Sequence, residues 1–365
     1  MYICENCFDS QSISNYIMQC GEKLDSYHCN SCECISEYRF EKNRLKEKVQ
    51  SIIREHYEHD NDHGLVTSAL IMAKDEDDDI TSFIPSGLYN LRDICYQLFE
   101  LDTINDKFYK LLEDYSRDVI SEFDDDSYSE NWMDIGCNWD GSKRILLDWN
   151  IFCERVKHSA RFFDHEGYDR TKELSKLDNT FQTLSKKVST TLYRARIINK
   201  ESTYLDIENN PEEALGIAPS HKSGHNRFSP TGIPYVYLSE DNETILKEIR
   251  VSISDRVGIG KFGIDNLNLI DLRKKNLEKI INNPFDYRCT AELLCSFKTI
   301  NAFLQDISKE VKKEVNHLEY IPTQIVSEYI WSLGYDGFIF DSSLCSGSNY
   351  VLFKNSYKFI DYTIE

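Results

Sequence analysis

Apolar residues recur at helical spacing within a charged background from about residue 40 to residue 180. One such face contains Leu45, Val49, Ile52 and Ile53. Residues three and four apart share one side of an α-helix, so this pattern predicts a mostly helical region. Acidic runs at Asp75–Asp79 and Asp124–Asp126 interrupt the region. Neither run has the ligand spacing of a calcium loop, and both are interpreted as solvated loops.

After Leu177 the pattern changes to short apolar stretches that are typical of β-strands. The predicted strands are Thr191–Ile198, Tyr235–Leu238, Leu267–Leu272, Gly337–Phe340, Tyr350–Phe353 and Lys358–Tyr362. Fewer helices lie among them, and the clearest predicted helix runs from Pro322 to Leu333 before a stop at Gly334. Another is predicted after the second strand, with Ser239, Asp241 and Asn242 as alternative caps. This half is therefore a mixed α/β domain, and residues 170–188 are its predicted linker.

Cysteines are concentrated at the start of the chain, where half of the twelve lie within the first 34 residues. They include the pairs Cys4-x2-Cys7 and Cys29-x2-Cys32, with 21 residues between the pairs. Two such turns can supply the four thiolates of a tetrahedral zinc site, and a closed set of four makes the metal structural. Further candidates for one ligand position are Cys20, His28 and Cys34.

Together these patterns predict an α+β protein with three parts. They are a small zinc knuckle at residues 1–40, a mostly helical domain at residues 41–180 and a mixed α/β domain at residues 188–365. A hydrophobic content of 41% and a charged content of 28% are ordinary for a globular protein. A net charge of −20 argues against a broad nucleic-acid surface. With no apolar run of membrane-spanning length and no signal-peptide pattern, we expect a cytoplasmic protein without a membrane partner.

The mixed α/β half contains four blocks of residues with candidate chemistry. In order, they carry Arg194 with Arg196, then Arg227 with Tyr237 and Glu248, then Ser342 with Ser343, and finally Gly347–Phe353. A cation, an aromatic ring and a carboxylate suit a phosphorylated ligand that contains a sugar. The first and third blocks each leave two candidates open, Arg194 or Arg196 and Ser342 or Ser343.

The order of these blocks resembles the RES family, whose members act on NAD. The resemblance covers residues 188–355 and implies a fold similar to that of the ADP-ribosyltransferases. It places the family's functional residues on Arg194, Arg227, Tyr237, Glu248 and Ser342, while the usual Gly-Arg-Trp becomes Asn226-Arg227-Phe228. The first half resembles the zinc-knuckle and helical region, or HEPN/RES N-terminal domain, that precedes RES in some bacterial proteins.

The resemblance implies that NAD is a substrate. Arginine can bind a diphosphate bidentately, so Arg194 and Arg227 are expected to bind NAD. Tyr237 or Phe228 is expected to stack on the nicotinamide ring, and Ser342 or Ser343 to orient it. The carboxylate of Glu248 would stabilise the positive charge that develops on the ribose as the bond to nicotinamide breaks.

The leading hypothesis is an NAD-cleaving glycohydrolase or phosphorylase, with water or phosphate as the acceptor. It would act as a toxin or anti-phage defence effector, under the control of an antitoxin or regulatory protein, and a homodimer is possible by analogy. One alternative transfers ADP-ribose to a macromolecule, and another is a non-catalytic interaction module. A ribonuclease based on Arg54-x4-His59 is the least favoured reading of the acidic chain.

Overall fold

The chain divides into two compact units. In the computed structural model, the described residues are 1–59, 88–101, 108, 111–112, 132–135, 147–164, 167–309, 311 and 315–365. One unit comprises Met1–Arg144 and Ile280–Cys295, and the other comprises Ile145–Lys279 and Ser296–Glu365. The predicted boundaries near residues 40 and 180–188 stay predictions. The acidic runs at Asp75–Asp79 and Asp124–Asp126 lie outside the described residues.

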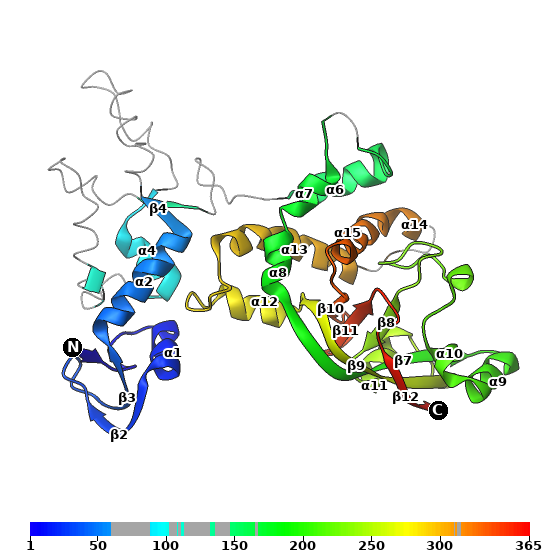
Figure 1. Cartoon of the computed structure of the whole chain (residues 1–365), viewed down its shortest axis with the longest axis horizontal. Coiled ribbons are helices and arrows are strands. Elements are labelled where there is room, and N and C mark those ends of the chain that lie inside the picture. Colours follow the sequence, from blue (N-terminus) through cyan, green and yellow to red (C-terminus); the bar gives the residue numbers. More distant parts are fainter. Residues whose placement is uncertain are drawn as a thin grey trace. The chain divides into compact units, whose positions relative to one another are not determined.

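The first unit combines two small sheets with helices (Figure 1). One sheet has the order β1-β3-β2, from Tyr2–Ile3, Ile35–Glu41 and Glu22–His28. The other has the order β4-β6-β5, from Tyr57–His59, Trp132–Asp134 and Leu88–Tyr89. The helices within its described residues include α1 (Gln11–Cys20), α2 (Lys42–His56) and α4 (Leu91–Phe99).

Helix α2 confirms the helix that the apolar periodicity predicts at residues 45–53. Its buried positions include Leu45, Val49, Ile52 and Ile53. They belong to the core of the first unit, which also contains Ile13 and Ile17 of α1. Burying an aliphatic side chain of this size contributes about 1.5–3 kcal/mol, so this face fixes α2 against the unit.

The second unit is built on a six-stranded sheet. Its strands are β7 (Ser185–Ile198), β8 (Val236–Ser239), β9 (Arg256–Asp271), β10 (Gly337–Asp341), β11 (Ser348–Leu352) and β12 (Lys358–Ile364). The order is β10-β11-β8-β7-β9-β12, and β10 also pairs with β9. The sheet therefore closes through a parallel β9–β10 contact at Leu269–Asp271, whereas the other pairs are antiparallel.

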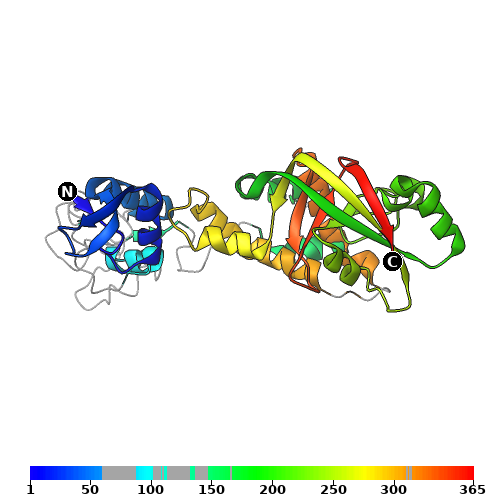
Figure 2. The same cartoon turned by 90° about the horizontal axis from the view of Figure 1, so that it is seen from below.

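Strand β9 is the longest element of this sheet. It pairs with β7 over most of its length and with β12 along its first half, as Figure 2 shows for these three strands. The prediction at this position covered only Leu267–Leu272. Each strand of the closed part contributes a fully buried side chain to one core: Leu192, Val236, Phe262, Ile339 and Leu352.

Helices complete the second unit. Before β7 lie α6 (Trp149–Glu154), the π-helical segment η3 (Arg155–Ser159), α7 (Arg170–Ser175) and α8 (Asp178–Leu184). Between β7 and β9 lie α9 (Glu201–Asn209), α10 (Pro211–Leu215), the 3-10 turn η4 (Ser220–Lys222) and α11 (Asn242–Glu248). Between β9 and β10 lie α12 (Lys274–Ile281), α13 (Ala291–Ser308), α14 (Asn316–Glu319) and α15 (Ile321–Ser332). The end of α12 and the start of α13 belong to the first unit, which includes Ile280–Cys295. None of the described helices is long and apolar enough to span a membrane.

The loop between β10 and β11 lies directly against the first turn of α11. A Cβ atom at Gly347 would meet the Oγ1 atom of Thr244 at 1.9 Å. Thr244 is itself buried, so it has little room to move aside. Glycine at position 347 is therefore what lets the two segments approach one another.

We expect Gly347→Ala to lower the free energy of unfolding by about 1–3 kcal/mol, because the loop or the helix must shift to accommodate the methyl group. Urea denaturation followed by circular dichroism measures the change. Gly224→Ala is the matched control, since a Cβ atom at Gly224 meets nothing within 4 Å. Equal stability of the two variants would contradict the close approach at Gly347.

Candidate functional site

A carboxylate stands at the C-terminal end of helix α11. Of the three candidate caps, Asp241 is the one that begins the helix, and its Oδ1 atom accepts the N–H of Thr244 at 2.7 Å. Thr244 and Ile245 are buried, which fixes the inner face of this short helix. Glu248 is the last helical residue, and its half-buried side chain is directed to the strands beyond.

Two side chains from neighbouring strands donate hydrogen bonds to the same oxygen of Glu248. The Ser342 hydroxyl, just after β10, reaches Oε1 at 2.6 Å, and the Nδ2 of Asn349 on β11 reaches Oε1 at 2.6 Å. Both are short hydrogen bonds to a charged acceptor, the stronger kind in proteins. The structure thus brings Glu248 and Ser342 together, as the sequence predicts.

Asn349 is a site residue that the sequence reasoning did not single out. Its Oδ1 atom accepts the hydroxyl of Ser239 at 2.7 Å, and the backbones of the two residues are register partners on β11 and β8. Asn349 lies within the closing block Gly347–Phe353, which was recognised only as a strand. A polar residue at the start of an apolar strand was the available signal.

The aromatic side of the site consists of Tyr237 and Phe228. Their rings stack with centroids 6.2 Å apart at an interplanar angle of 23°. The Tyr237 hydroxyl lies 3.1 Å from Ser229 Oγ and accepts the N–H of Phe228 at 3.4 Å. Burial raises the pKa of Tyr237 to about 12, so this phenol remains neutral at physiological pH.

Arg227 is engaged by the end of helix α13. Its guanidinium donates to the carbonyl oxygens of Asp306 at 2.8 Å, of Lys309 at 2.8 Å and of Ile307. The guanidinium also lies 5.2 Å from the ring centroid of Tyr320. A helix C-terminus leaves carbonyls without partners and carries partial negative charge, so a cation is stabilising there. Arg227 therefore fixes a wall of the site.

A cavity of about 430 Å³ connects these groups. Arg227, Phe228, Tyr237 and Glu248 line it, together with apolar side chains and further polar or charged residues: Ser239, Arg250, Ser308, Lys309, Asp341, Ser343, Asn349 and Tyr350. Its volume is within the range of about 300–1,000 Å³ that is usual for small-molecule sites. Cations and the carboxylates of Glu248 and Asp341 thus line one space, which suits a ligand with both anionic and electron-deficient parts.

Three of the predicted candidates, Ser342, Arg194 and Arg196, lie outside the lining of this cavity. Ser342 is buried and takes part through Glu248, whereas Ser343 is exposed and lines the cavity. Arg194, on β7, donates to the Leu215 carbonyl at 2.8 Å, and burial lowers its pKa. Arg196 is exposed and donates to the Ala214 carbonyl at 3.2 Å. Both arginines therefore hold the end of α10.

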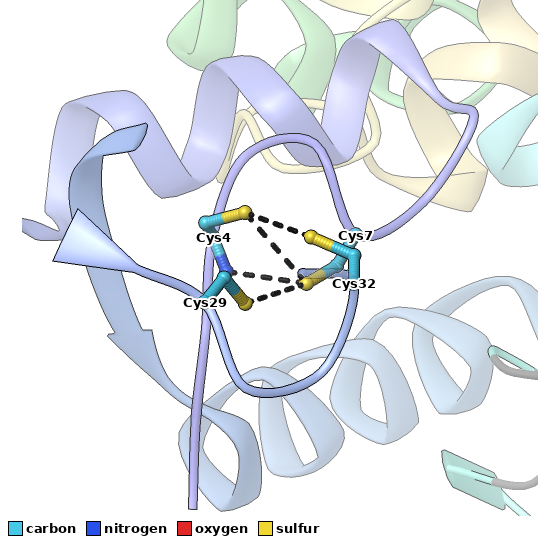
Figure 3. A group of neighbouring side chains, drawn as sticks. All are labelled: Cys4, Cys7, Cys29 and Cys32. Atoms are coloured by element: carbon cyan, nitrogen blue, oxygen red, sulfur yellow. Dashed lines mark hydrogen bonds between the residues drawn. The ribbon is translucent and has the colours of Figure 1, made fainter. Parts of the chain in front are cut away.

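The cysteine pairs of the first unit form a single cluster (Figure 3). The Sγ atoms of Cys4, Cys7, Cys29 and Cys32 lie within 4.8 Å of one another. Sγ–Sγ distances of 3.4 Å join Cys4 to Cys32 and Cys7 to Cys29. A zinc ion with four sulfurs at about 2.3 Å in a tetrahedron needs sulfurs separated by about 3.8 Å, close to this arrangement. Cys20, His28 and Cys34 are not members of the cluster.

The electrostatics of the four thiols also favour a cation. Burial raises the pKa of Cys4 and Cys7, and that of Cys7 reaches about 12. Burial acts in the same direction on Cys32, but hydrogen bonds from the Cys34 backbone and from the other thiols outweigh it and lower its pKa to about 7. Four thiolates in one buried place repel one another, and a bound cation removes that repulsion. The cluster can therefore hold a metal ion.

Comparisons with known proteins give a family match in the second half of the chain. Residues 191–363 match the model of the RES domain. The sequence has no match among the curated proteins. Among solved structures, one similar chain comes from the crystal structure of the M. tuberculosis MbcT–MbcA toxin-antitoxin complex. It is 9% identical, the alignment covers 54% of this chain and 93% of that chain, and the TM-score is 0.32.

We expect Arg227→Gln to lower the free energy of unfolding by about 2 kcal/mol or more, because glutamine cannot donate to the carbonyls of Asp306, Ile307 and Lys309 together. Thermal unfolding measures the loss. Arg196→Gln serves as the control, since its exposed side chain makes a single long hydrogen bond and should cost less than about 1 kcal/mol. An Arg227 variant as stable as the Arg196 variant would refute the structural part of this role.

Proposed function

We propose that this chain, whose residues 191–363 form a RES domain, is an NAD-consuming enzyme that cleaves the nicotinamide–ribosyl bond. RES domains act on NAD, and the family match therefore supports an enzyme that acts on NAD, without specifying the reaction. The observation that carries the proposal is the carboxylate of Glu248, which two donors hold at a cavity that cations also line. In this proposal NAD is a substrate, and the catalytic group is Glu248.

The chemistry requires only one carboxylate. As the C–N bond breaks, its electron pair passes to the pyridinium nitrogen and nicotinamide leaves as a neutral molecule. Positive charge then develops on the ribose, as in glycoside cleavage. A fixed carboxylate stabilises that charge more in the transition state than in the ground state, which is the condition for catalysis. Because the leaving group needs no proton, no general acid is required.

The remaining residues have proposed roles in binding. Phe228 and Tyr237 offer an aromatic surface for the cationic nicotinamide ring. Arg227, with Lys309 at the same cavity, supplies positive charge for a diphosphate, although much of the Arg227 guanidinium is already engaged by α13. The diphosphate role of Arg194 stays a prediction, because its guanidinium is directed to Leu215. Ser343 is the exposed hydroxyl of its pair and is available to a ligand.

The proposal leaves two acceptors for the ribosyl group, water and inorganic phosphate. Water would add an oxygen to the ribose, lose a proton and give ADP-ribose, whereas inorganic phosphate would give the corresponding ribosyl phosphate. Either reaction consumes NAD, and loss of NAD suits a toxin or defence effector acting in the cytoplasm. An antitoxin or other regulatory protein and a homodimer stay predictions, as does the alternative transfer of ADP-ribose to a macromolecule.

We expect the purified protein to release nicotinamide from NAD, and Glu248→Gln to lower that rate by at least about 100-fold, the effect of removing one charge-stabilising group. Chromatography quantifies nicotinamide in reactions with and without phosphate, and the ribosyl product identifies the acceptor.

Glu243→Gln is the matched control, because Glu243 is an exposed residue of the same helix and pairs with Lys247. It should retain the wild-type rate. No release by the wild-type protein, or equal loss in both variants, would rule out the proposed reaction. Label from NAD on a macromolecule would favour the transferase, and no binding of NAD would favour an interaction module.

We further propose that the cysteine cluster holds one structural zinc ion. The donor set of four thiolates is the one that structural zinc sites use, and it leaves no open coordination position for catalysis. Zinc would thereby stabilise the first unit and take no part in NAD cleavage.

Elemental analysis of the purified protein should find one zinc per chain, and Cys29→Ser should abolish it while lowering the melting temperature, because metal binding contributes folding free energy. Cys20→Ser is the control, since this exposed cysteine lies outside the cluster and should leave the zinc content unchanged. Full zinc occupancy in Cys29→Ser would exclude the proposed ligand set.

A further inference from the structure

We propose that Asn349 is a positioning residue for Glu248, and that Ser239 holds the Asn349 side-chain amide in the orientation that this requires. The inference rests on the proposed function, because the orientation matters for the reaction assigned to Glu248. Its basis is a chain of three side chains, in which Ser239 donates to Asn349 and Asn349 donates to Glu248.

The chemistry of the partners determines which end of the amide faces which neighbour. An ionised carboxylate only accepts hydrogen bonds, so the Nδ2 group must face Glu248. The Oδ1 atom then faces Ser239, whose hydroxyl can donate to it. The reverse orientation would place Oδ1 against the carboxylate oxygen, with no hydrogen between two negative atoms. A donor at position 239 therefore stabilises the productive orientation.

The sheet holds this chain of contacts in place. Asn349 lies on β11 between β8 and β10, with Ser239 and Phe340 as its register partners. Ser239 is 1% exposed and Asn349 is 8% exposed, so their hydrogen bonds are largely screened from bulk water although both residues line the cavity. Side chains on regular strands hold a functional group more firmly than side chains on loops.

Both donors to the carboxylate reach the same oxygen. Ser342 and Asn349 each bond Oε1 at 2.6 Å, and neither bonds Oε2. The carboxylate is thereby fixed at one oxygen. Among the described residues none bonds its other oxygen, which can meet a ligand in the cavity that Glu248 lines. A group aligned before the reaction needs no reorganisation as charge develops, which is where such an arrangement contributes to the rate. Ser342 is thus assigned a share in the same positioning, alongside its predicted contact with NAD.

The first test compares rates of nicotinamide release. We expect Asn349→Ala to lower kcat about 10- to 100-fold, the rate equivalent of one hydrogen bond to a charged group, while KM for NAD changes less than about threefold. Ser239→Ala should lower kcat less, and Ser239→Thr, which restores a hydroxyl, should recover the wild-type value. Asn276→Ala is the matched control, because its amide bonds the Asp271 carbonyl away from the cavity. Melting temperatures separate these effects from unfolding.

The second test does not need activity. In ¹⁵N-labelled protein, the side-chain amide signal of Asn349 is identified by its loss in Asn349→Ala. We expect this signal to move in Glu248→Gln, where the charged acceptor is lost, and in Ser239→Ala, where the donor is lost.

The two tests separate the inference from the proposed function. If the wild-type protein releases no nicotinamide, the proposed reaction fails, and movement of the Asn349 signal still supports the contact chain. An Asn349 signal that both substitutions leave in place overturns the inference whether or not the protein cleaves NAD. In an active protein, an unchanged kcat in Asn349→Ala, or no recovery in Ser239→Thr, also overturns it.

Discussion

The pairing of β11 with β8 is the constraint on which the candidate site depends. Strand β8 leads into helix α11, whose last residue is Glu248, and β11 pairs with β8 from Asn349 to Leu352. Strand β10 pairs with β11 in turn, so Ser342 follows the strand next to that of Asn349. Ser342 and Asn349 thereby reach Glu248, although about one hundred residues separate them from it in sequence. The parallel contact with β9 occupies the other edge of β10 and closes the sheet.

Some charged side chains in this region stabilise the ends of helices, and others line the cavity. The guanidinium of Arg227 neutralises the carbonyl end of α13, and Arg194 does the same for the carbonyl of Leu215 at the end of α10. Glu248 is held by its neighbours but retains an oxygen for the cavity. An arginine in a sequence motif can therefore stabilise the fold as well as bind a ligand. Only the structure shows how much of its guanidinium is already bonded to the protein.

Local signals predicted the parts of the fold that depend on neighbouring residues. The start of α11 near its three candidate caps, the helix near Pro322–Leu333 and the two Cys-x2-Cys turns could be predicted because their causes lie within a few positions. The first half of β9 was missed because Gly258, Gly260 and Gly263 break its apolar alternation. Asn349 was missed because its role comes from the register of β11 with β8, which no local pattern specifies. The grouping of Arg227, Tyr237 and Glu248 followed from their order in the chain.

The cysteine cluster has a consequence for how the stability of the first unit responds to its surroundings. A metal ion held by all four thiolates would bind the folded chain and not the unfolded one, in which the two cysteine pairs are not held together. The free energy of unfolding would then rise with the concentration of free metal and fall as protons compete for the thiolates. The short strands β1, β2 and β3 would thus depend on metal supply as well as on the contacts that they make.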